Sequence, residues 1–583
     1  MNNKQLSLTP FLFGLASVVA MDTANAARVE HNLTDQVIVQ FSNPNESGAL
    51  KANGLSRQIN KKLSFVRKTS LGMHVFKLPS METLPSIRGY VTAIRAVSGV
   101  KHAEADQMMF AIGDLAVPPT EGTASSTLSP IYDLQWHYFE PVGGMNAEGA
   151  WGQLNSSDPV VNVAVLDTGI TDHPDLTDNV VGGTDMISTT FVSNDGDGRD
   201  SDPSDPGDWV DANYCGGGYP ADSSSWHGTH VSGTISAITN NAYGVAGVGY
   251  NLLKVVPVRV LGKCGGYTSD IADGIVWAAT GNSNPNKAKV INMSLGGSGS
   301  CSTTYQQAIN TAVAAGTTVV VSAGNSNANA ANYSPASCDN VISVASTGRT
   351  GGKAYYSNYG ALVDFAAPGG DMSTGGANGV LSTLNDGDQS PGASIYAYYQ
   401  GTSMAAPHVA AVAGLMYVKK PSITPAEVEA TLASTARAFP TSCSQCGSGI
   451  LDAGAAIAAL DGNAPPPPPP EVAPAAPGYF NVLAGNSVAD LAWSDQSANE
   501  TGFYIERRKK NRRRWTGFSG VITTSADVTG YQDTGLDGTY QYRIRSQNNA
   551  GVSAWLVSGE VVIASDSDGG NSGGCKGNGK KCR

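Results

Sequence analysis

The sequence predicts an α/β domain built on a parallel sheet, with a small mixed domain before it and an all-β domain after it. Residues 160–166 form a nearly continuous apolar run, which is typical of a parallel strand covered on both faces. Helix-like segments alternate with such runs, and this alternation predicts a parallel sheet with functional groups at the carboxyl ends of its strands. The further runs lie at residues 253–261, 289–293, 317–322 and 341–345, and the helices at residues 230–238, 269–280 and 303–315.

The N-terminus has the pattern of a removable secretory signal. Lys4 precedes a short apolar run at residues 11–21, and Ala24-Asn25-Ala26 supplies small residues for cleavage. We expect residues 1–26 to be cut off after Ala26; an uncleaved membrane anchor is the alternative. The apolar run is short for a bilayer span, and no second long run follows it. The sequence therefore predicts a secreted protein with no membrane attachment once the signal is removed.

Residues 27–125 form a small mixed segment. Strands are expected at residues 37–41, 73–78 and 100–104, and a helix at residues 85–96. No constellation of catalytic residue types occurs here, so the segment is either an independent small domain or a propeptide that assists folding and blocks a site. Residues 116–130 are polar and contain proline, which favours an exposed processing linker.

Composition limits the class of protein. The chain has 583 residues, so more than one domain is expected, and 41% hydrophobic residues with 14% charged residues suit a globular protein with a large core. The formal net charge of −12 argues against nucleic acid as a partner.

The eight cysteines of an exported chain predict disulfides. Sequence alone leaves the connectivity open, and zinc binding is the competing interpretation, although no His stands at finger spacing. Pairing nearest neighbours gives Cys215 with Cys264, Cys301 with Cys338, Cys443 with Cys446, and Cys575 with Cys582.

Four short motifs stand at predicted element ends. Asp167-Thr168-Gly169 follows the first apolar strand, His227-Gly228-Thr229-His230 opens a helix, and Asn325 follows the strand at residues 317–322. Ser403 opens a buried helix at residues 408–418, where free N–H groups and the helix dipole suit a nucleophile that generates an oxyanion. Each motif alone has a structural explanation, such as a turn or a helix cap. All four in this order are hard to obtain by chance.

With these motifs, residues 131–460 closely resemble the subtilisin-like serine peptidases, the subtilases. The resemblance implies a subtilisin-like, mostly parallel sheet flanked by helices, which we place at residues 126–460. It also implies that Asp167, His227 and Ser403 form the catalytic triad and that Asn325 stabilises the oxyanion; this chain order is the one known for subtilisin. His230 and His408 are expected to be structural.

The resemblance also implies a substrate cleft. A Ser-Leu-Gly strand would pair with an extended peptide, and its glycine would leave room for the side chain before the scissile bond (P1). Small uncharged residues predict a broad preference for apolar P1 groups. The residues concerned are Ser294, Leu295, Gly296, Ala323, Gly324 and Asn332.

Structural Ca²⁺ is expected at two places. The loop at residues 194–203 carries carboxylates between glycines, and like charges this close favour a bound cation over a merely solvated acidic loop; Asp195, Asp197 and Asp202 are the preferred ligands. The resemblance implies a second site with Asp175, Asn241 and Gln135.

The early segment resembles the inhibitory and folding-assisting propeptide of subtilases. Such a domain sits on the peptidase and leaves its C-terminal tail in the cleft until it is cut. The tail here would run from about Phe110, with the mature N-terminus between Ala111 and Ser129.

A proline run at residues 465–470 marks an extended linker, placed at residues 461–477. Short alternating strands follow, and with Trp493 and the Tyr540–Arg545 strand, residues 478–565 resemble a fibronectin type III sandwich. The basic run at residues 507–514 is interpreted as a solvated strand and hairpin. Residues 566–583 are Gly- and Lys-rich and are expected to be disordered.

The sequence thus predicts a secreted, monomeric serine endopeptidase, made as a self-processed zymogen, that acts on proteins and peptides and is inhibited by its own propeptide. Two alternatives remain: a catalytically silent binding protein with this fold, and a matrix-binding module with an attached peptidase.

Overall fold

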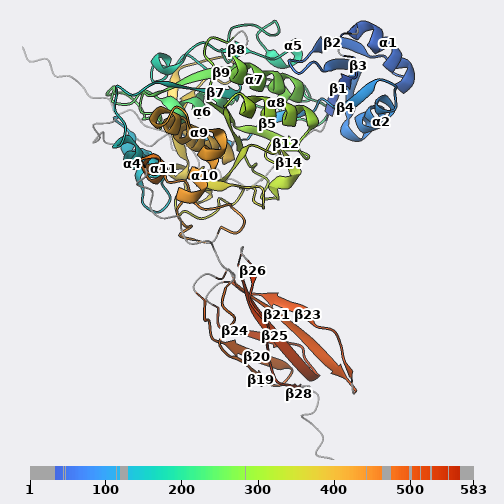
Figure 1. Cartoon of the computed structure of the whole chain (residues 1–583), viewed down its shortest axis with the longest axis vertical. Coiled ribbons are helices and arrows are strands. Elements are labelled where there is room, and N and C mark those ends of the chain that lie inside the picture. The colour runs from blue at the N-terminus through green and yellow to red at the C-terminus, as the bar shows by residue number, and fades with distance from the viewer. Residues whose placement is uncertain are drawn as a thin grey trace, which may run out of the picture.

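The structure is a computed structural model (Figure 1). It describes residues 33–112, 114–117, 129–461 and 474–564, apart from residues 44, 46, 282–283, 442, 498–499, 501, 513, 526–527 and 549–550. The predicted signal peptide, the proline run, the C-terminal tail and the proposed Cys575–Cys582 pair lie outside the described residues.

The N-terminal domain, residues 33–105, is a four-stranded antiparallel sheet with two helices on one face. The strands lie in the order β2-β3-β1-β4, and Val37, Val39 and Phe76 of the sheet pack against Leu55 and Ile87 of the helices. The elements are β1 (Leu33–Phe41), α1 (Gly48–Ile59), β2 (Ser64–Lys68), β3 (His74–Thr83), α2 (Leu84–Arg95) and β4 (Val100–Ala105). The predicted strands and helix are present, and α1 and β2 are additional.

The central domain is organised around a parallel sheet of seven described strands in the order β16-β15-β13-β11-β7-β9-β8. All of its pairings are parallel. The strands are β7 (Val161–Asp167), β8 (Thr184–Asp185), β9 (Leu253–Arg259), β11 (Val290–Met293), β13 (Thr318–Ser322), β15 (Ile342–Thr347) and β16 (Phe365–Pro368). The five apolar runs of the sequence are therefore five of its strands.

Helices cover both faces of this sheet, which is why its strands are apolar throughout. Val163 and Val165 of β7 face one hydrophobic core with α6 and α9, whereas Ala164 and Leu166 face another with α7 and α8. The helices are α6 (His227–Ser236), α7 (Thr268–Thr280), α8 (Thr303–Ala314), α9 (Thr402–Lys419), α10 (Pro425–Thr435) and α11 (Ala453–Leu460), with the short α3 (Trp136–Phe139), α4 (Ala147–Trp151) and α5 (Thr190–Ser193).

Two small sheets include the chain that follows the N-terminal domain. β5 (Met108–Ala111) lies between β10 (Gly266–Tyr267) and β12 (Leu295–Ser298), and β12 also pairs with β14 (Tyr333–Ser334). β6 (Asp114–Val117) pairs with β18 (Ser394–Gln400), which also pairs with β17 (Val380–Asn385). The segment after residue 105 is thus bound to the central domain on both sides of residue 113.

The C-terminal domain, residues 474–564, is an antiparallel two-sheet sandwich with its own core around Trp493, Phe503 and Tyr542. This agrees with the all-β prediction. One sheet contains β19 (Phe480–Ala484), β20 (Val488–Trp493) and β24 (Gly530–Thr534). The other contains β21 (Gly502–Asn511), β22 (Arg514–Trp515), β23 (Ser519–Thr523), β25 (Gly538–Asn548), β26 (Gly551–Val552), β27 (Leu556–Val557) and β28 (Val561–Ile563).

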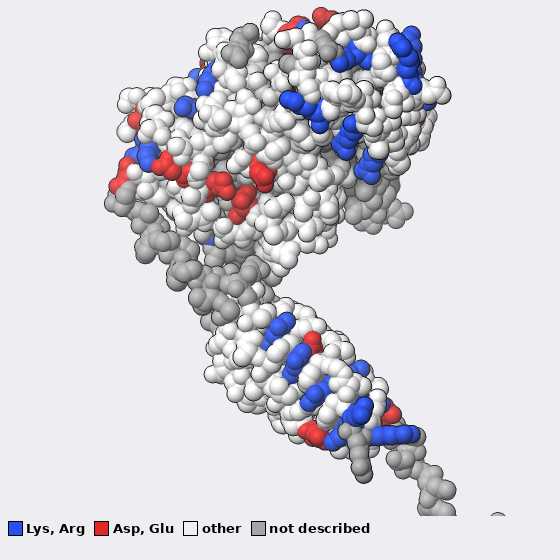
Figure 2. Space-filling model, turned by 45° about the vertical axis from the view of Figure 1, so that its right-hand side comes forward, with Lys and Arg blue, Asp and Glu red and all other residues white. Residues whose placement is uncertain are grey.

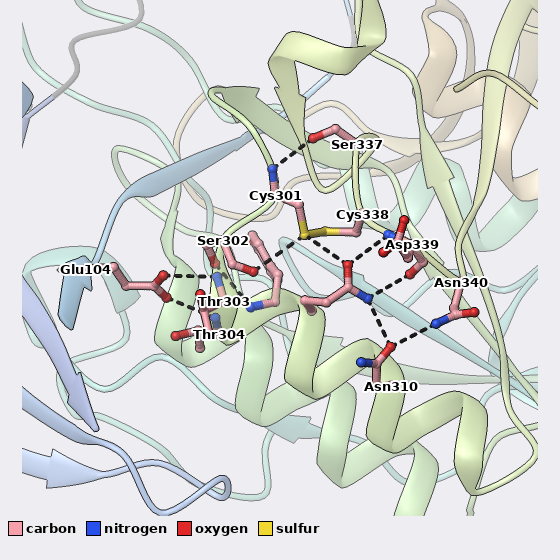
Figure 3. Close-up of a disulfide and its surroundings, with 12 residues drawn as sticks. Glu104, Cys301, Ser302, Thr303, Thr304, Asn310, Ser337, Cys338, Asp339 and Asn340 are labelled. Carbon is pink, nitrogen blue, oxygen red and sulfur yellow. Dashed lines mark hydrogen bonds between the residues drawn. A yellow bond between two sulfur atoms is a disulfide. The ribbon is translucent and has the colours of Figure 1, made fainter. Parts of the chain in front are cut away.

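Three of the proposed disulfides are present: Cys215–Cys264, Cys301–Cys338 and Cys443–Cys446. Figure 3 shows the second of them at the start of α8. Among the described helices, none has the length and apolar character needed to cross a membrane.

Candidate active site

Asp167 and His227 form a buried carboxylate–imidazole pair. Asp167 is the last residue of β7 and His227 the first of α6, and both side chains are almost completely buried. His227 Nδ1 lies 2.8 Å from Asp167 Oδ1 and 3.0 Å from Oδ2, so Nδ1–H donates to the carboxylate and Nε2 is left as the basic nitrogen. Nε2 is buried and has no hydrogen-bond partner among the described residues.

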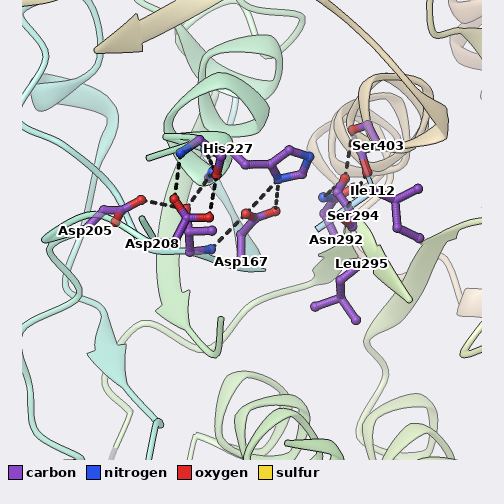
Figure 4. A network of polar contacts seen from close by, with 12 residues as sticks. Ile112, Asp167, Asp205, Asp208, His227, Asn292, Ser294, Leu295 and Ser403 are labelled. Carbon is purple, nitrogen blue, oxygen red and sulfur yellow. Dashed lines mark hydrogen bonds and ion pairs between the residues drawn. The ribbon is translucent and has the colours of Figure 1, made fainter. Parts of the chain in front are cut away.

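Ser403 lies in the first turn of α9 and faces this pair. Figure 4 shows the ring edge of His227 that carries Nε2 turned toward Ser403. The Ser403 hydroxyl donates to the carbonyl oxygen of Ser294 at 2.9 Å. Ser403 and His227 are therefore not hydrogen-bonded to each other here, because the serine hydroxyl is bound to Ser294 and His227 Nε2 has no partner among the described residues.

Asn325 lies just beyond β13, on the same edge of the sheet as Asp167. Its Oδ1 accepts hydrogen bonds from the Thr402 amide at 2.9 Å and the Thr402 hydroxyl at 2.8 Å. These bonds fix the amide orientation, so that Nδ2 donates to the carbonyl oxygen of Ile112 at 3.2 Å. The predicted oxyanion residue thus holds a peptide carbonyl next to Ser403.

Two further carboxylates, Asp205 and Asp208, hold the backbone around the Asp167–His227 pair. The Thr168 amide donates to Asp167 Oδ1 at 2.8 Å, and the Thr168 hydroxyl donates to Asp205 at 2.6 Å. Asp208 accepts from the Ser225 amide and hydroxyl at 2.6 and 2.8 Å. Burial, together with the nearby negative charge of Asp208, raises the pKa of Asp205 above its usual range. Figure 4 shows both carboxylates to the left of the Asp167–His227 pair, on the side away from Ser403.

The other two histidines near the site are structural, as the resemblance implied. Burial lowers the pKa of His230 to about 3, with a smaller contribution in the same direction from the neighbouring His227. Burial lowers the pKa of His408 to about 4, and its Nδ1–H donates to the Met404 carbonyl at 2.7 Å. Both rings are therefore neutral at ordinary pH and do not compete as bases.

Of the predicted substrate residues, Ser294, Leu295 and Gly296 are hydrogen-bonded to or paired with residues 110–112. Leu295 and Gly296 pair with Ala111 and Phe110 of β5, and the Ser294 carbonyl accepts from the Ile112 amide at 3.3 Å. A Cβ on Gly296 would lie 2.9 Å from Ile112 Cδ1 and 3.0 Å from the Ser334 carbonyl oxygen, so a larger residue here would press on both neighbouring segments.

Ala323, Gly324 and Asn332 have other hydrogen-bond partners. The Ala323 carbonyl accepts from Asn358, and the Gly324 amide donates to Thr402. Asn332 is exposed, and its carbonyl accepts from Gly299 at 2.7 Å, which places it at the end of the β12–β14 pair.

The ligand set implied for the second calcium site does not fit a cation in this structure. Asp175 accepts from the Asn241 side-chain amide at 2.7 Å, the Val245 amide at 2.9 Å and the Tyr396 hydroxyl at 3.2 Å. Both polar atoms of the Gln135 side chain bind the Ala246 backbone. Donors rather than oxygen ligands thus surround the carboxylate, and burial raises the pKa of Asp175 to about 6.

The acidic loop is partly neutralised by the protein itself. Arg259 is buried at the end of β9 and pairs with Asp195 at 2.5 Å and with Asp185. Asp202 accepts from the Ser204 amide and hydroxyl, while Asp195, Asp197 and Asp202 all remain at the surface. Among the described residues, no group of three or more His, Cys, Asp or Glu side chains is arranged to hold a metal ion.

Sequence reasoning missed the residues that position the site. Thr168 stood inside a recognised motif, but Asp205 and Asp208 belong to the stretch that follows the acidic loop, and nothing in their spacing marks them. Thr402 directly precedes Ser403, and only its contact with Asn325 shows what it does.

Comparison with known proteins places this geometry in a family. The subtilase family matches residues 159–449. An extracellular protease of Xanthomonas campestris pv. campestris is 48% identical over 408 residues, which are 69% of this chain and 66% of that protein. An extracellular basic protease of Dichelobacter nodosus is 40% identical over 474 residues, which are 77% of this chain and 74% of that protein.

Solved structures agree. A protease from Pseudoalteromonas arctica has 59% sequence identity and a TM-score of 0.56, and the match covers 57% of this chain and 99% of that one. Fervidolysin from Fervidobacterium pennivorans has 20% identity and a TM-score of 0.53 over 91% of this chain and 78% of that one, which supports the fold alone. The chain belongs to the subtilase family of subtilisin-like serine peptidases.

Proposed function

We propose that this chain is a secreted serine endopeptidase, made as a self-processed zymogen, with Asp167, His227 and Ser403 as its triad. The observation that carries the proposal is the buried Asp167–His227 pair, whose free Nε2 faces the serine at the start of α9. Two relatives that are named extracellular proteases support both the activity and the compartment.

The residues divide the work of peptide hydrolysis. His227 Nε2 would take the proton of the Ser403 hydroxyl and later give it to the leaving amine, while Asp167 holds the ring and stabilises its charged form. Asn325 would donate to the oxyanion, and Thr402 keeps its amide pointed there. The first turn of α9 adds unpaired N–H groups at Ser403.

The N-terminal domain would act as the intramolecular inhibitor. Glu104 accepts from the amides of Thr303 and Thr304 at 3.0 Å each, and so caps the start of α8 (Figure 3). Asp106 accepts from the Ser269 amide at the start of α7 at 2.9 Å. Arg67 pairs with Asp270 and Asp273 of the same helix. These buried polar contacts support docking of the domain beside the cleft that its tail occupies.

Structural calcium belongs to the proposal only at the loop of residues 194–203. Subtilases commonly bind structural calcium, and Asp195, Asp197 and Asp202 of this loop are all exposed. A chelator is then expected to lower the thermal midpoint, and the double variant Asp197→Asn, Asp202→Asn should abolish that effect. An unchanged midpoint on chelation would contradict calcium binding.

A second function is favoured by the surface of the C-terminal domain. Arg508 lies over Trp515 and Phe518, Arg543 over Phe518 and Trp555, and Arg545 over Trp555, with distances of 4.1–4.8 Å to the ring centroids. Figure 2 shows Lys and Arg side chains gathered on this face. Arginine side chains stacked on aromatic rings would suit a matrix-binding module. Removal of residues 465–583 should then reduce hydrolysis of insoluble proteins more than that of casein.

A fluorophosphonate probe tests the main proposal. The secreted protein should be labelled, and the Ser403→Ala variant should not. Ser434→Ala, at an exposed serine on α10, is the matched control and should be labelled like the parent. If the folded parent remains unlabelled, the chain is a silent binding protein with a peptidase fold.

A further inference from the structure

Residues 108–112 lie in the cleft as an extended peptide would. Met108 and Met109 pair with Tyr267 and Gly266 on one side, and Phe110 and Ala111 pair with Gly296 and Leu295 on the other. An extended segment held between two strands gains its affinity from backbone hydrogen bonds. The Met109 side chain is buried and packs near Gly297, so side-chain contacts also fix the register.

The pairing places one peptide carbonyl at the reacting position. Ile112 donates its amide to the Ser294 carbonyl at 3.3 Å, and its own carbonyl accepts from Asn325 Nδ2 at 3.2 Å. The Ser403 hydroxyl binds the same Ser294 carbonyl at 2.9 Å. Nucleophile and oxyanion donor are therefore both at Ile112, as Figure 4 shows for Ser403, Ser294 and Ile112.

The chain continues through the site. β6 pairs with β18 beyond residue 113, with Asp114 opposite Gln400 and Val117 opposite Tyr398. Strands thus hold the peptide on both sides of the Ile112 carbonyl. This is the arrangement required of a substrate whose peptide bond is cut between them, because reacting groups are brought together before the reaction begins.

We propose that the enzyme cuts its own chain at the bond after Ile112, and that the Ile112 side chain defines an aliphatic P1 preference. This rests on the proposed function. Ser403 Oγ attacks the Ile112 carbonyl carbon and gives its proton to His227 Nε2. The C–N bond to Gly113 then breaks, and the proton passes to the Gly113 nitrogen. Water hydrolyses the Ile112 ester on Ser403 and restores the serine, leaving a carboxylate at Ile112.

Intact mass of the first fragment tests the proposal directly. The full chain is refolded, quenched with acid at successive times and analysed by mass spectrometry, with casein hydrolysis followed in parallel. The first N-terminal fragment should end at Ile112, whatever later trimming occurs at the new N-terminus. The Ser403→Ala chain should stay uncut.

Variants of Ile112 test the pocket. Ile112→Asp should slow the first cut more than tenfold, because a carboxylate would replace the aliphatic side chain whose Cδ1 lies against Gly296, and Ile112→Leu should restore it. Leu50→Asp, at an exposed position of the N-terminal domain, is the matched control and should process normally. Equal thermal midpoints of Ile112→Asp and its parent, both in the Ser403→Ala background, would show that folding is intact.

Two results would overturn the proposal in distinguishable ways. Casein hydrolysis with a first fragment that ends at another residue, or unchanged cutting of Ile112→Asp at the same bond, refutes the cut after Ile112 alone. Absence of both cutting and casein hydrolysis in the folded parent refutes the proposed function as well.

Discussion

At the residue scale, the site depends on how single side chains are held. Thr402 binds Asn325 Oδ1 twice and so aims Nδ2 at the reacting carbonyl. The hydroxyl of Ser403, by contrast, is hydrogen-bonded to the Ser294 carbonyl and not to His227. The oxyanion donor is therefore preorganised, whereas the nucleophile must turn before it can react.

We expect Asn325→Ala to lower kcat by about 10²–10³-fold, which is the effect known for the corresponding Asn of subtilisin. Because the lost contact is made mainly in the transition state, KM should change little. Steady-state kinetics on a peptide substrate measure this. Asn310→Ala, at an exposed position on α8, is the control, and a large rise in KM in the Asn325 variant would contradict the assignment.

Arg259 is a buried cation whose loss should destabilise the domain. It pairs with Asp185 and Asp195, and burial already raises the pKa of Asp185 to about 7 even though Arg259 lowers it. Arg259→Met should cost about 3–5 kcal/mol, because it leaves a buried acid unpaired. The thermal midpoint measures this.

The control for that variant is an exposed ion pair. Arg349 is bound to Glu140 with 42% of its side chain exposed, so Arg349→Met should cost about 0–1 kcal/mol. Equal effects of the two substitutions would show that Arg259 contributes no more than a surface charge.

At the level of single residues, the site could be predicted from sequence only where short motifs mark the chemistry. Asp167, His227, Asn325 and Ser403 each carry local signals, and the structure brings them to one edge of the sheet. Arg259, Asp205 and Asp208 act through contacts between segments distant in sequence, and no local pattern marks such contacts. The acidic loop predicted a cation, and one cation present there is the chain's own arginine.

At the element scale, the N-terminal domain docks through the starts of two helices. Glu104 and Asp106 bind amides that the first turns of α8 and α7 leave free. Burial raises the pKa of Glu104, but hydrogen bonds from His102 and Thr304 outweigh it, and the net pKa is lowered. Burial raises the pKa of Asp106 to about 7.

The raised pKa of Asp106 gives docking a defined pH dependence. The docked carboxyl keeps its proton up to about pH 7, whereas the free carboxyl loses it near 3.8. Stability from this group is therefore full below about pH 4 and is lost as the pH rises to 7, by at most about 1.4 kcal/mol per unit. Asp106→Asn should flatten this decline.

Urea unfolding of the Ser403→Ala chain between pH 4.5 and 7.5 measures the effect. The first transition is the relevant one, since a multidomain chain need not unfold in one step. Asp158→Asn, at a surface loop aspartate outside the docked contacts, should leave the slope unchanged. The same steep decline in the Asp106→Asn variant would show that another group is responsible.

Element boundaries show why some elements escaped prediction. Long apolar runs located five strands of the central sheet, but β8 and β16 have only two and four residues and are too short for such a run. α6 begins at His227 behind Trp226, which has φ 50° and provides no side-chain cap. The motif at His227 marked this helix start in the sequence, whereas the apolar helical pattern alone begins only at residue 230, because the usual N-cap signal is missing.

At the scale of the whole molecule, the C-terminal sandwich has a core of its own, drawn from residues 489–563. A domain with its own core can fold independently. Removing residues 465–583 should therefore leave the thermal midpoint of the remaining chain unchanged. Its turnover of small peptides should stay within about twofold of the parent value. If the truncated chain failed to fold and to be secreted, the C-terminal domain would not be independent.

The order of domains was predictable from sequence because composition changes sharply at the proline run and at the first buried strand. How the N-terminal domain is held was not predictable, since it depends on helix starts that become available only when the central domain has folded.

The pairing of β6 with β18 has a further consequence for how activity appears. After cleavage, hydrogen bonds to separate strands would still hold both new chain ends. Cleavage alone would therefore not empty the active-site cleft. The newly formed amine would stay near the ester and could reseal it before water arrives. Cleavage of the chain and the appearance of activity would then occur at different times. On a gel, the cleaved band would appear before hydrolysis of added substrate begins.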